Sequence, residues 1–274
     1  MRRWLPLMVG VVALVAASAA CAQTPSYTLT APPRADAERV FTDAGMRGCF
    51  VVHDVRADRT LRVNAARCAR RLPPASTFKI PNALIGLETG VVTDEHMVIA
   101  WDGVERSITD WNRDLDLAAA IRVSSVPYFQ ELARRVGATR MRDWVRRFGY
   151  GNRDIRGGID RFWLDGRLRI SADEQVAFLQ HVQARMLPVS ARTIDILRRI
   201  ITLDERADGA ALRAKTGWAL RGNWNVGWFV GWIERDDDAW IFALNVEPVG
   251  KPPADFLAQR RRLAESLLRL HGVW

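Results

Sequence analysis

Four short motifs that follow one another along the chain carry the residue types of a nucleophilic site. They are Ser76-Thr77-Phe78-Lys79, Ser124-Ser125-Val126, Tyr150-Gly151-Asn152 and Lys215-Thr216-Gly217. In the first motif, a hydroxyl and an amine three residues apart would share one face at the start of a helix. A serine hydroxyl needs an adjacent base to become a nucleophile, and lysine can be that base only when its amine is neutral. The first motif therefore predicts acyl transfer through a serine ester.

Each motif has a plainer interpretation when it stands alone. Ser76 could cap a helix on which Lys79 is solvated, and Ser124 could cap another helix. The Lys215 motif could be an ordinary strand end, and residues 150–152 could form a turn. Their occurrence together, in one order and at spacings that fit one scaffold, favours a single catalytic site.

The apolar patterning predicts the elements that hold these motifs. Residues 76–89 have apolar side chains at helical spacing and are followed by Gly90, a helix stop signal. Strands from both ends of the chain would form one antiparallel sheet flanked by helices, with a helical subdomain inserted between them. This is an α/β chain of the α+β type. Helices are predicted at 36–46, 76–89, 127–136, 139–147, 173–186, 190–202 and 255–270, and strands at 50–55, 61–63, 211–217, 225–234 and 239–247.

Composition and charge narrow the class of protein. With 274 residues, 49% hydrophobic and 26% charged, the chain can bury the core of one large domain. The formal net charge is +9, and much of the excess lies in arginine pairs on predicted helices. A basic chain can bind nucleic acid, but no nucleic-acid motif is present, so solvated helix faces are the simpler explanation. Modest attraction of anionic substrates also follows from this charge.

The N-terminus has the pattern of a signal peptide. Arg2 and Arg3 precede an apolar run, and small residues around Cys21 offer a cleavage site. Ser18 stands where a lipoprotein signal usually has a larger apolar residue, which favours cleavage after Ala22 over a lipid anchor. We therefore expect a signal peptide at 1–22, one catalytic domain at 23–274, a periplasmic location and no membrane anchor.

The motifs resemble those of one enzyme family, the class D (oxacillinase-type) serine β-lactamases. The Ser-x-x-Lys and Lys-Thr-Gly pair recurs in serine β-lactamases and penicillin-binding proteins. Ser-x-Val at 124–126, Tyr-Gly-Asn at 150–152 and Phe-Trp-Leu-x-Gly at 162–166 are similar to class D motifs. The segments 74–82 and 227–232 also look like this family, and the resemblance covers roughly residues 40 to 270.

The resemblance implies a β-lactam hydrolase with the serine β-lactamase/D,D-peptidase fold. Ser76 would be the nucleophile, and Lys79 the general base after its amine reacts with CO2 to form a carbamate (N6-carboxylysine). An apolar pocket would lower the pKa of this lysine, and Phe78, Val126 and Leu164 could supply that pocket. The Trp163 indole N–H could donate to the carbamate. CO2 or bicarbonate is thus required, while no other cofactor is expected.

The remaining roles concern the leaving group and the substrate. Ser124 would pass a proton to the leaving nitrogen, with Lys215 polarising it. The backbone N–H groups of Ser76 and Trp218 would bind the oxyanion. Thr216 could bind the substrate carboxylate beside Gly217. The family also uses an arginine at the start of the last helix, where the apolar phase suggests Arg260 and leaves Arg261 open.

The cysteines, the histidines and the partners complete the expectations. An oxidising compartment permits a disulfide between Cys49 and Cys68, with two unpaired small hydrophobes as the alternative. The scattered histidines lack metal-ligand spacing, so no metal is assigned. Expected partners are small-molecule β-lactams, with no nucleic acid, and the chain would be a monomer or homodimer. Rival interpretations are a penicillin-binding D,D-peptidase and a β-lactam sensor domain that stays acylated.

Overall fold

The computed structural model describes Met1, residues 27–221 and residues 224–274. Apart from Met1, the predicted signal peptide at 1–22 lies outside the described residues, so it stays a prediction. Within the described ranges, none of the helices combines the length and the apolar character that crossing a membrane requires.

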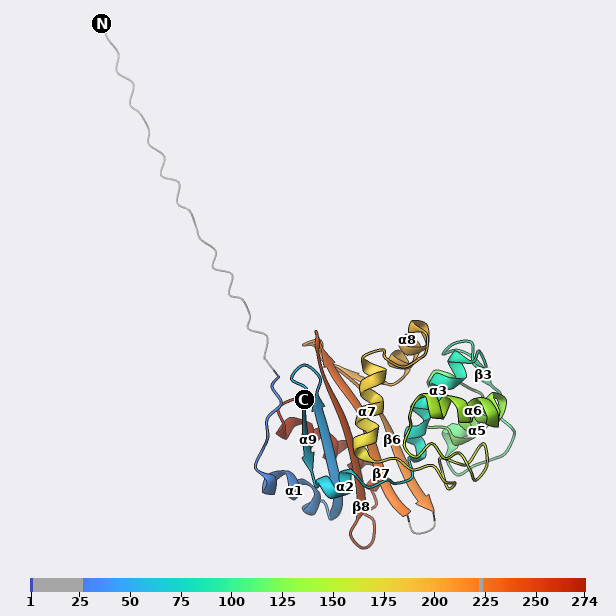
Figure 1. The fold of residues 1–274 in the computed structure, drawn as a ribbon, viewed down its shortest axis with the longest axis horizontal. Coiled ribbons are helices and arrows are strands. Elements are labelled where there is room, and N and C mark those ends of the chain that lie inside the picture. The colour runs from blue at the N-terminus through green and yellow to red at the C-terminus, as the bar shows by residue number, and fades with distance from the viewer. Residues whose placement is uncertain (2–26, 222–223) are drawn as a thin grey trace.

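A six-stranded antiparallel sheet forms the centre of the molecule (Figure 1). Its strand order is β2-β1-β8-β7-β6-β5, so the first two strands of the chain pair with the last ones. The predicted sheet built from both chain ends is thereby confirmed. The strands of the sheet are β1 (Met46–Asp54), β2 (Arg59–Val63), β5 (Thr202–Glu205), β6 (Ala211–Arg221), β7 (Trp224–Arg235) and β8 (Asp238–Pro248).

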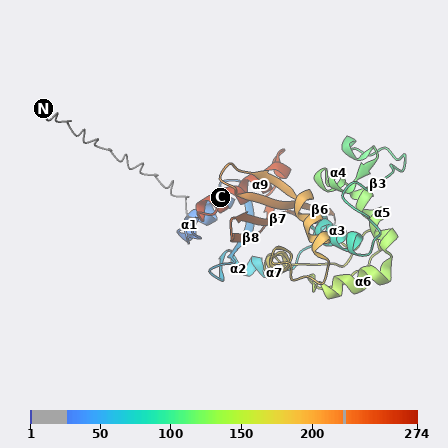
Figure 2. The same ribbon diagram turned by 90° about the horizontal axis from the view of Figure 1, so that it is seen from above.

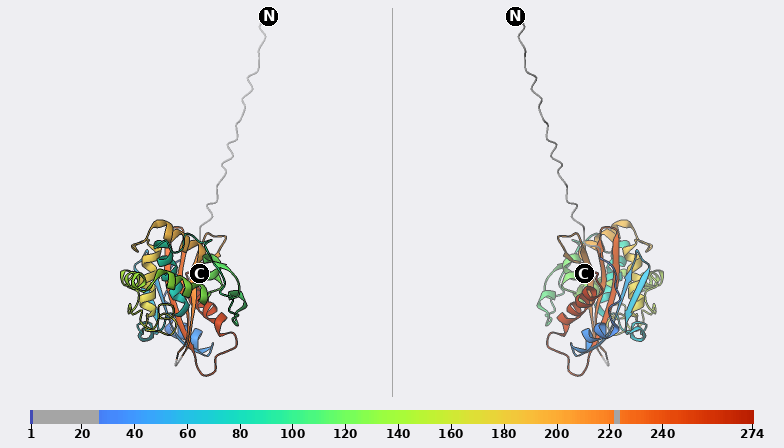
Figure 3. Two further views of the ribbon diagram at one scale, coloured as in Figure 1. Left: turned by 90° about the vertical axis from the view of Figure 1, so that its right-hand side faces the viewer. Right: turned by 90° about the vertical axis from the view of Figure 1, so that its left-hand side faces the viewer.

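Helices cover both faces of this sheet. The central strands β7 and β8 are therefore buried along almost their whole length. On one face, α1 (Arg34–Thr42) and α9 (Phe256–Leu270) pack over the strands (Figure 3). On the other face lie α7 (Ala172–Gln183) and the helical subdomain (Figure 2). A capping box between Ser171 and Glu174 fixes the start of α7.

The helical subdomain carries the first three motifs. The 3₁₀ helix η1 (Ala75–Phe78) leads directly into α3, and α3 packs against α5 and α8. The elements of this part are α3 (Lys79–Glu88), β3 (Val98–Ile99), η2 (Thr109–Trp111), β4 (Leu115–Asp116), α4 (Leu117–Arg122), α5 (Val126–Val136), α6 (Ala138–Arg147) and α8 (Ala191–Ile200). The short helix α2 (Ala65–Cys68) packs instead against β1 and β2.

Some predicted boundaries were wrong. The helix predicted at 36–46 ends at Thr42, because Gly45 adopts a positive φ and Met46 already pairs with Pro248 in the sheet. The helices predicted at 173–186 and 190–202 end at Gln183 and Ile200. The short elements α2, α4, β3, β4 and β5 were not predicted, since their few residues give too little periodicity.

The predicted disulfide is not formed, because Cys49 and Cys68 are free, buried thiols. The Cys68 thiol lies 3.4 Å from the Val63 carbonyl oxygen as a donor, and Asn245 Nδ2 donates to Cys49 Sγ at 3.1 Å. A hydrogen bond to Cys49, and burial, raise the pKa of Cys68. In the structure both cysteines are therefore small, unpaired core residues whose sulfur atoms are hydrogen-bonded. This agrees with the alternative interpretation, two unpaired small hydrophobes.

Candidate active site

Ser76 lies in η1 on a strained turn. The preceding Ala75 has a positive φ of 48°, which non-glycine residues rarely adopt and which is characteristic of functional sites. The Ala75 N–H donates to the Trp163 carbonyl at 3.0 Å, which ties the Trp163 segment to the nucleophile turn. Ser76 itself is only half-buried, so a substrate can reach its hydroxyl.

Lys79, the first residue of α3, reaches back to the serine. Its Nζ donates to Ser76 Oγ at 2.6 Å, and the side chain is 0% exposed. Burial, with a further contribution from the charge of Lys215, lowers the pKa of Lys79 well below its usual value. No carboxylate among the described residues pairs with it, and its Nζ lies 5.5 Å from the centre of the Phe129 ring. A neutral amine is therefore the favoured form.

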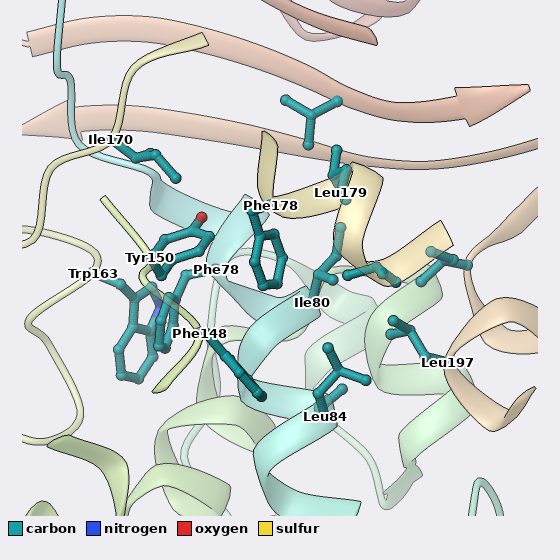
Figure 4. Close-up of a cluster of buried hydrophobic side chains, with 14 of the residues drawn as sticks. Phe78, Ile80, Leu84, Phe148, Tyr150, Trp163, Ile170, Phe178, Leu179 and Leu197 are labelled. Carbon is teal, nitrogen blue, oxygen red and sulfur yellow. The ribbon is translucent and has the colours of Figure 1, made fainter. Parts of the chain in front are cut away.

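Trp163 lies in an aromatic cluster with Phe78, the residue before Lys79, and its ring stacks on Phe78 at 5.4 Å and 24° (Figure 4). Its indole Nε1 is buried and has no hydrogen-bond partner within the described ranges. A buried donor without a partner costs about 1–3 kcal/mol, so such a group in a native structure indicates an acceptor supplied from elsewhere. An anionic group on the neighbouring lysine would fit this position.

The apolar pocket predicted around Lys79 included Phe78. In the structure the Phe78 ring lies in an aromatic cluster, with its centroid 4.9 Å from that of Phe162. Phe129, from α5, was not predicted as a member, because it is close to Lys79 only through the packing of α5 on α3. Val126 and Leu164, which were predicted, are half-buried at the start of α5 and after Trp163.

Lys215 occupies the other side of the site, on β6. Its Nζ donates to Ser124 Oγ at 2.9 Å and to the Thr216 carbonyl at 3.2 Å. Burial, and then the charge of Arg260, lower the pKa of Lys215 to about 7. Ser124 has a positive φ of 54°, and Ser125, not Ser124, caps α5. The Ser124 hydroxyl is therefore left to the lysine, as the catalytic interpretation of this motif requires.

Strand β6 approaches the nucleophile turn at Gly217. A Cβ at this position would lie 2.9 Å from the Pro74 carbonyl oxygen and 3.0 Å from Thr77 Cγ2. Only glycine fits this contact, which brings the backbone of Trp218 next to η1. The Trp218 ring is exposed, and its Nε1 donates to Asn225 Oδ1 at 3.0 Å.

The structure separates the two candidate arginines of α9. Arg260 is 7% exposed, and its guanidinium donates to the Gly217 carbonyl on the catalytic strand. Gly227 leaves space for it, because a Cβ there would lie 2.6 Å from Arg260 Cδ. Arg261 instead pairs with Glu265 at 2.6 Å, although it also lines the pocket beside Lys215. Arg260 therefore has the more direct connection to the Lys215 strand.

The third motif, residues 150–152, contributes one core side chain and one loop side chain next to the site. Tyr150 is fully buried, and the centroid of its ring lies 5.6 Å from that of Phe78, so it supports Phe78 from within the core. Asn152 organises the following loop: its Oδ1 accepts from the Arg169 N–H at 3.0 Å and its Nδ2 donates to the Arg167 carbonyl at 2.9 Å.

Four other tryptophans are divided between the core and a pocket. Trp228 and Trp232 are fully buried core residues on β7. Trp101 and Trp111 line one pocket with Ser125, at the edge of the second motif. Among the residues that the structure describes, no group of three or more His, Cys, Asp or Glu side chains is arranged to hold a metal ion.

The site combines a serine hydroxyl with a buried lysine amine, where a helical subdomain meets an antiparallel sheet. This arrangement is typical of enzymes that transfer acyl groups through a serine. Residues 22–268 match the family model described as the penicillin binding protein transpeptidase domain. The chain is 42% identical to beta-lactamase OXA-48 of Klebsiella pneumoniae over 85% of this chain and 86% of that protein. It is 43% identical to beta-lactamase OXA-10 of Pseudomonas aeruginosa over 76% of this chain and 79% of that protein.

Solved structures agree with these relatives. A class D beta-lactamase YbXI from Nostoc matches with a TM-score of 0.83 and 37% identity, covering 87% of this chain and 99% of that one. FUS-1 (OXA-85), a class D beta-lactamase from Fusobacterium nucleatum, matches with a TM-score of 0.82 and 36% identity over 87% and 98% of the two chains. The chain belongs to the class D β-lactamases, a family of hydrolases, as its motifs predicted.

Proposed function

We propose that this protein hydrolyses the amide of β-lactam antibiotics through an acyl-enzyme on Ser76, with Lys79 as the carbamylated general base, and so confers antibiotic resistance. The observation that carries this proposal is the Lys79 amine, which is fully buried, unpaired with any carboxylate of the described residues and 2.6 Å from Ser76 Oγ. A lysine in these surroundings is kept neutral, which suits both proton abstraction and reaction with CO2.

Acylation begins when Ser76 Oγ attacks the lactam carbonyl and gives up its proton toward Lys79. The backbone N–H groups of Ser76 and Trp218 donate hydrogen bonds to the developing oxyanion, because the close approach at Gly217 sets β6 beside η1. Ser124, hydrogen-bonded to Lys215 at 2.9 Å, delivers a proton to the leaving nitrogen. With a pKa of about 7, Lys215 can both give and regain that proton near neutral pH.

A carbamate on Lys79 would supply one base for both acylation and deacylation. The described residues fit such a group, because Trp163 Nε1 is a buried donor without a partner and the Phe78 stack holds its ring in place. The complete burial of Lys79 excludes bulk water and keeps the amine neutral. No separate carboxylate is then required to activate the deacylating water.

The substrate carboxylate is assigned to the β6 side of the site. The Thr216 hydroxyl and the Arg260 guanidinium flank the backbone of Gly217, and both lie on the side of Lys215. A pocket of about 400 Å³ lined by Lys215, Thr216 and Arg261 opens beside them. Positive charge around this pocket favours an anionic substrate.

Export through the signal peptide at 1–22 would place the enzyme in the periplasm, where it meets β-lactams. The proposal adds no metal, nucleic acid or membrane anchor, and a monomer or homodimer remains the expected assembly.

Turnover of a chromogenic cephalosporin and of oxacillin by the purified protein tests this function. Sustained hydrolysis is expected, and the Ser76→Ala variant should show none. A single stoichiometric burst followed by a lasting adduct on Ser76 would contradict the proposal. That result would favour the D,D-peptidase or the acylated sensor instead.

A further inference from the structure

A second basic pocket lies away from the catalytic residues, between α6 and the segment 152–159. Its volume is about 810 Å³, and none of the residues assigned to catalysis or substrate binding lines it. Four arginines line it together with a single acidic residue, Asp154. They are Arg142, Arg146, Arg153 and Arg156.

Three of these arginines carry charge that the described part of the chain does not neutralise. Arg142 and Arg146 are exposed and one helical turn apart on α6, a spacing at which like charges repel. Arg153 is exposed and has a positive φ of 58°. Within the described ranges, none of the three guanidiniums has a hydrogen bond or an ion pair.

The single acidic residue of the pocket is already engaged. Asp154 accepts from Arg156 Nη2 at 2.6 Å and from its Nε at 2.9 Å, and this pairing lowers the pKa of Asp154 to about 2. Asp143, the acidic residue of α6, does not line the pocket. The residues that line the pocket therefore carry a net charge of +3.

Two other arginine pairs on the helices have carboxylates as partners. Arg134 and Arg135 on α5 both pair with Glu131, at 3.0 and 2.8 Å. On α8, Arg198 pairs with Glu234 at 2.6 Å, and Arg199 pairs with Glu95 at 2.6 Å. The α6 pocket therefore differs from an ordinary solvated helix face, on which arginines have carboxylates within reach.

We propose that this pocket binds a phosphoryl-bearing anion with two or more negative charges. Guanidinium groups match phosphate oxygens in bidentate geometry, and three of them converge on one recess. Ile155, Ile159 and Ala138 form an apolar wall beside them, which suits a phosphate attached to a small organic group. Such a ligand would relieve the repulsion between Arg142 and Arg146.

An anion bound here would also hold the segment 152–159 against α6. That segment is tied to the Trp163 loop, because the Arg167 N–H donates to the Arg156 carbonyl at 3.0 Å and Asn152 bonds to the Arg167 carbonyl. A ligand that bridges α6 and this segment stabilises the folded state by mass action, so thermal unfolding reports its binding.

Calorimetric titration of inorganic pyrophosphate into the purified protein, at constant ionic strength, tests the proposal. The wild type should bind one equivalent, and binding should raise its unfolding temperature. The double variant Arg142→Gln/Arg146→Gln should bind at least tenfold more weakly, roughly the effect of losing one charge-assisted hydrogen bond. Arg153→Gly, which removes the guanidinium and tolerates the positive φ, should weaken binding in the same direction.

The matched control is Arg34→Gln/Arg39→Gln on α1, which removes the same charge from exposed positions outside the pocket. It should bind pyrophosphate as the wild type does. Equal binding by all four proteins, equal weakening in the control, or binding of several equivalents would overturn the proposal. Circular dichroism and cephalosporin turnover should be unchanged in every variant, which shows that the variants fold.

Co-sedimentation with vesicles that contain phosphatidic acid, whose headgroup is a phosphomonoester, distinguishes a free anion from a lipid headgroup. Pyrophosphate binding without co-sedimentation supports a free phosphorylated ligand. Co-sedimentation that pyrophosphate displaces, and that Arg142→Gln/Arg146→Gln lacks, supports the same phosphate chemistry in a headgroup. Vesicle binding that the double variant retains, together with no pyrophosphate binding, would overturn the site.

Discussion

The two buried lysines of the site lie in surroundings of opposite character. Lys79 is fully buried, has the Ser76 hydroxyl as its polar neighbour, and lies with its Nζ 5.5 Å from the centre of the Phe129 ring. Lys215 is almost as deeply buried, but it bonds to the Ser124 hydroxyl and the Thr216 carbonyl and lies near Arg260. Burial lowers the pKa values of both lysines.

This difference in surroundings supports the different roles that we propose for the two lysines. The apolar pocket keeps Lys79 neutral, which makes it a base and a nucleophile toward CO2. The polar side leaves Lys215 close to half-protonated near pH 7, so it can exchange a proton with Ser124. Changes on each side should therefore have distinct consequences.

The largest effect is expected for Lys79→Met, which fills the same volume without an amine. Turnover should fall by about 10³-fold or more, since the nucleophile loses its base. The urea midpoint should not fall, because an apolar side chain suits this pocket better than an amine. Steady-state kinetics and urea unfolding measure both, with the exposed Lys251→Met as the control. Turnover within tenfold of wild type would refute a catalytic Lys79.

Trp163→Phe should have the next largest effect. The substitution keeps the ring that stacks on Phe78 and removes only the indole N–H. Losing one hydrogen bond to an anionic group should lower kcat by about 10- to 100-fold, and added bicarbonate should restore part of it. Trp240→Phe, whose indole donates to Asp54 outside the site, is the control. Unchanged activity without bicarbonate would show that the Trp163 indole has no such role.

A smaller effect is expected for Arg260→Gln. KM for a carboxylate-bearing substrate should rise by about tenfold while kcat changes less, which corresponds to one lost charge-assisted hydrogen bond. The neighbouring Arg261→Gln, which breaks the pair with Glu265, should leave KM close to the wild-type value. The reverse ranking in Michaelis kinetics would assign the carboxylate to Arg261.

A further effect is a pH dependence of stability that comes from Lys215. Its pKa is about 7 in the folded protein and about 10.5 in the unfolded chain, so the unfolded state binds more protons between these values. The free energy of unfolding of the wild type should therefore rise from pH 7 to 10.5, relative to Lys215→Met. Urea midpoints of both proteins at each pH measure this. A difference that stays constant, or falls, would contradict the burial of a neutral Lys215.

The same contrast explains how much could be predicted from the sequence. The β7 and β8 strands were predicted from long apolar runs and the intervening acidic turn, and η1 with α3 from helical spacing after Ser76. Ser76, Lys79, Ser124 and Lys215 were all predicted, and the structure brings each serine within hydrogen-bond distance of a lysine. Local patterns were sufficient for these features because strands and motifs are contiguous in sequence.

Features that depend on tertiary packing could not be predicted in this way. Phe129 is an ordinary apolar position on α5, and only the packing of α5 on α3 places it near Lys79. The ring of Tyr150 supports Phe78 from within the core, although its motif resembles a surface turn. The free thiols of Cys49 and Cys68 depend on hydrogen bonds to Val63 and Asn245, which no spacing rule indicates.

One measurement tests the central claim that Lys79 carries the carbamate. The purified protein is equilibrated with ¹³C-labelled bicarbonate, and the carbamate carbon is observed by NMR in wild type, Lys79→Met, Lys215→Met and Lys251→Met. These are the three lysines of the chain, and the N-terminal amine, whose signal should be the same in all four proteins, is the remaining amine that can form a carbamate. One further carbamate signal, lost only in Lys79→Met and weakened in Trp163→Phe, is the predicted result. Survival of this further signal in Lys79→Met, or its absence in an actively hydrolysing wild type, would contradict the account.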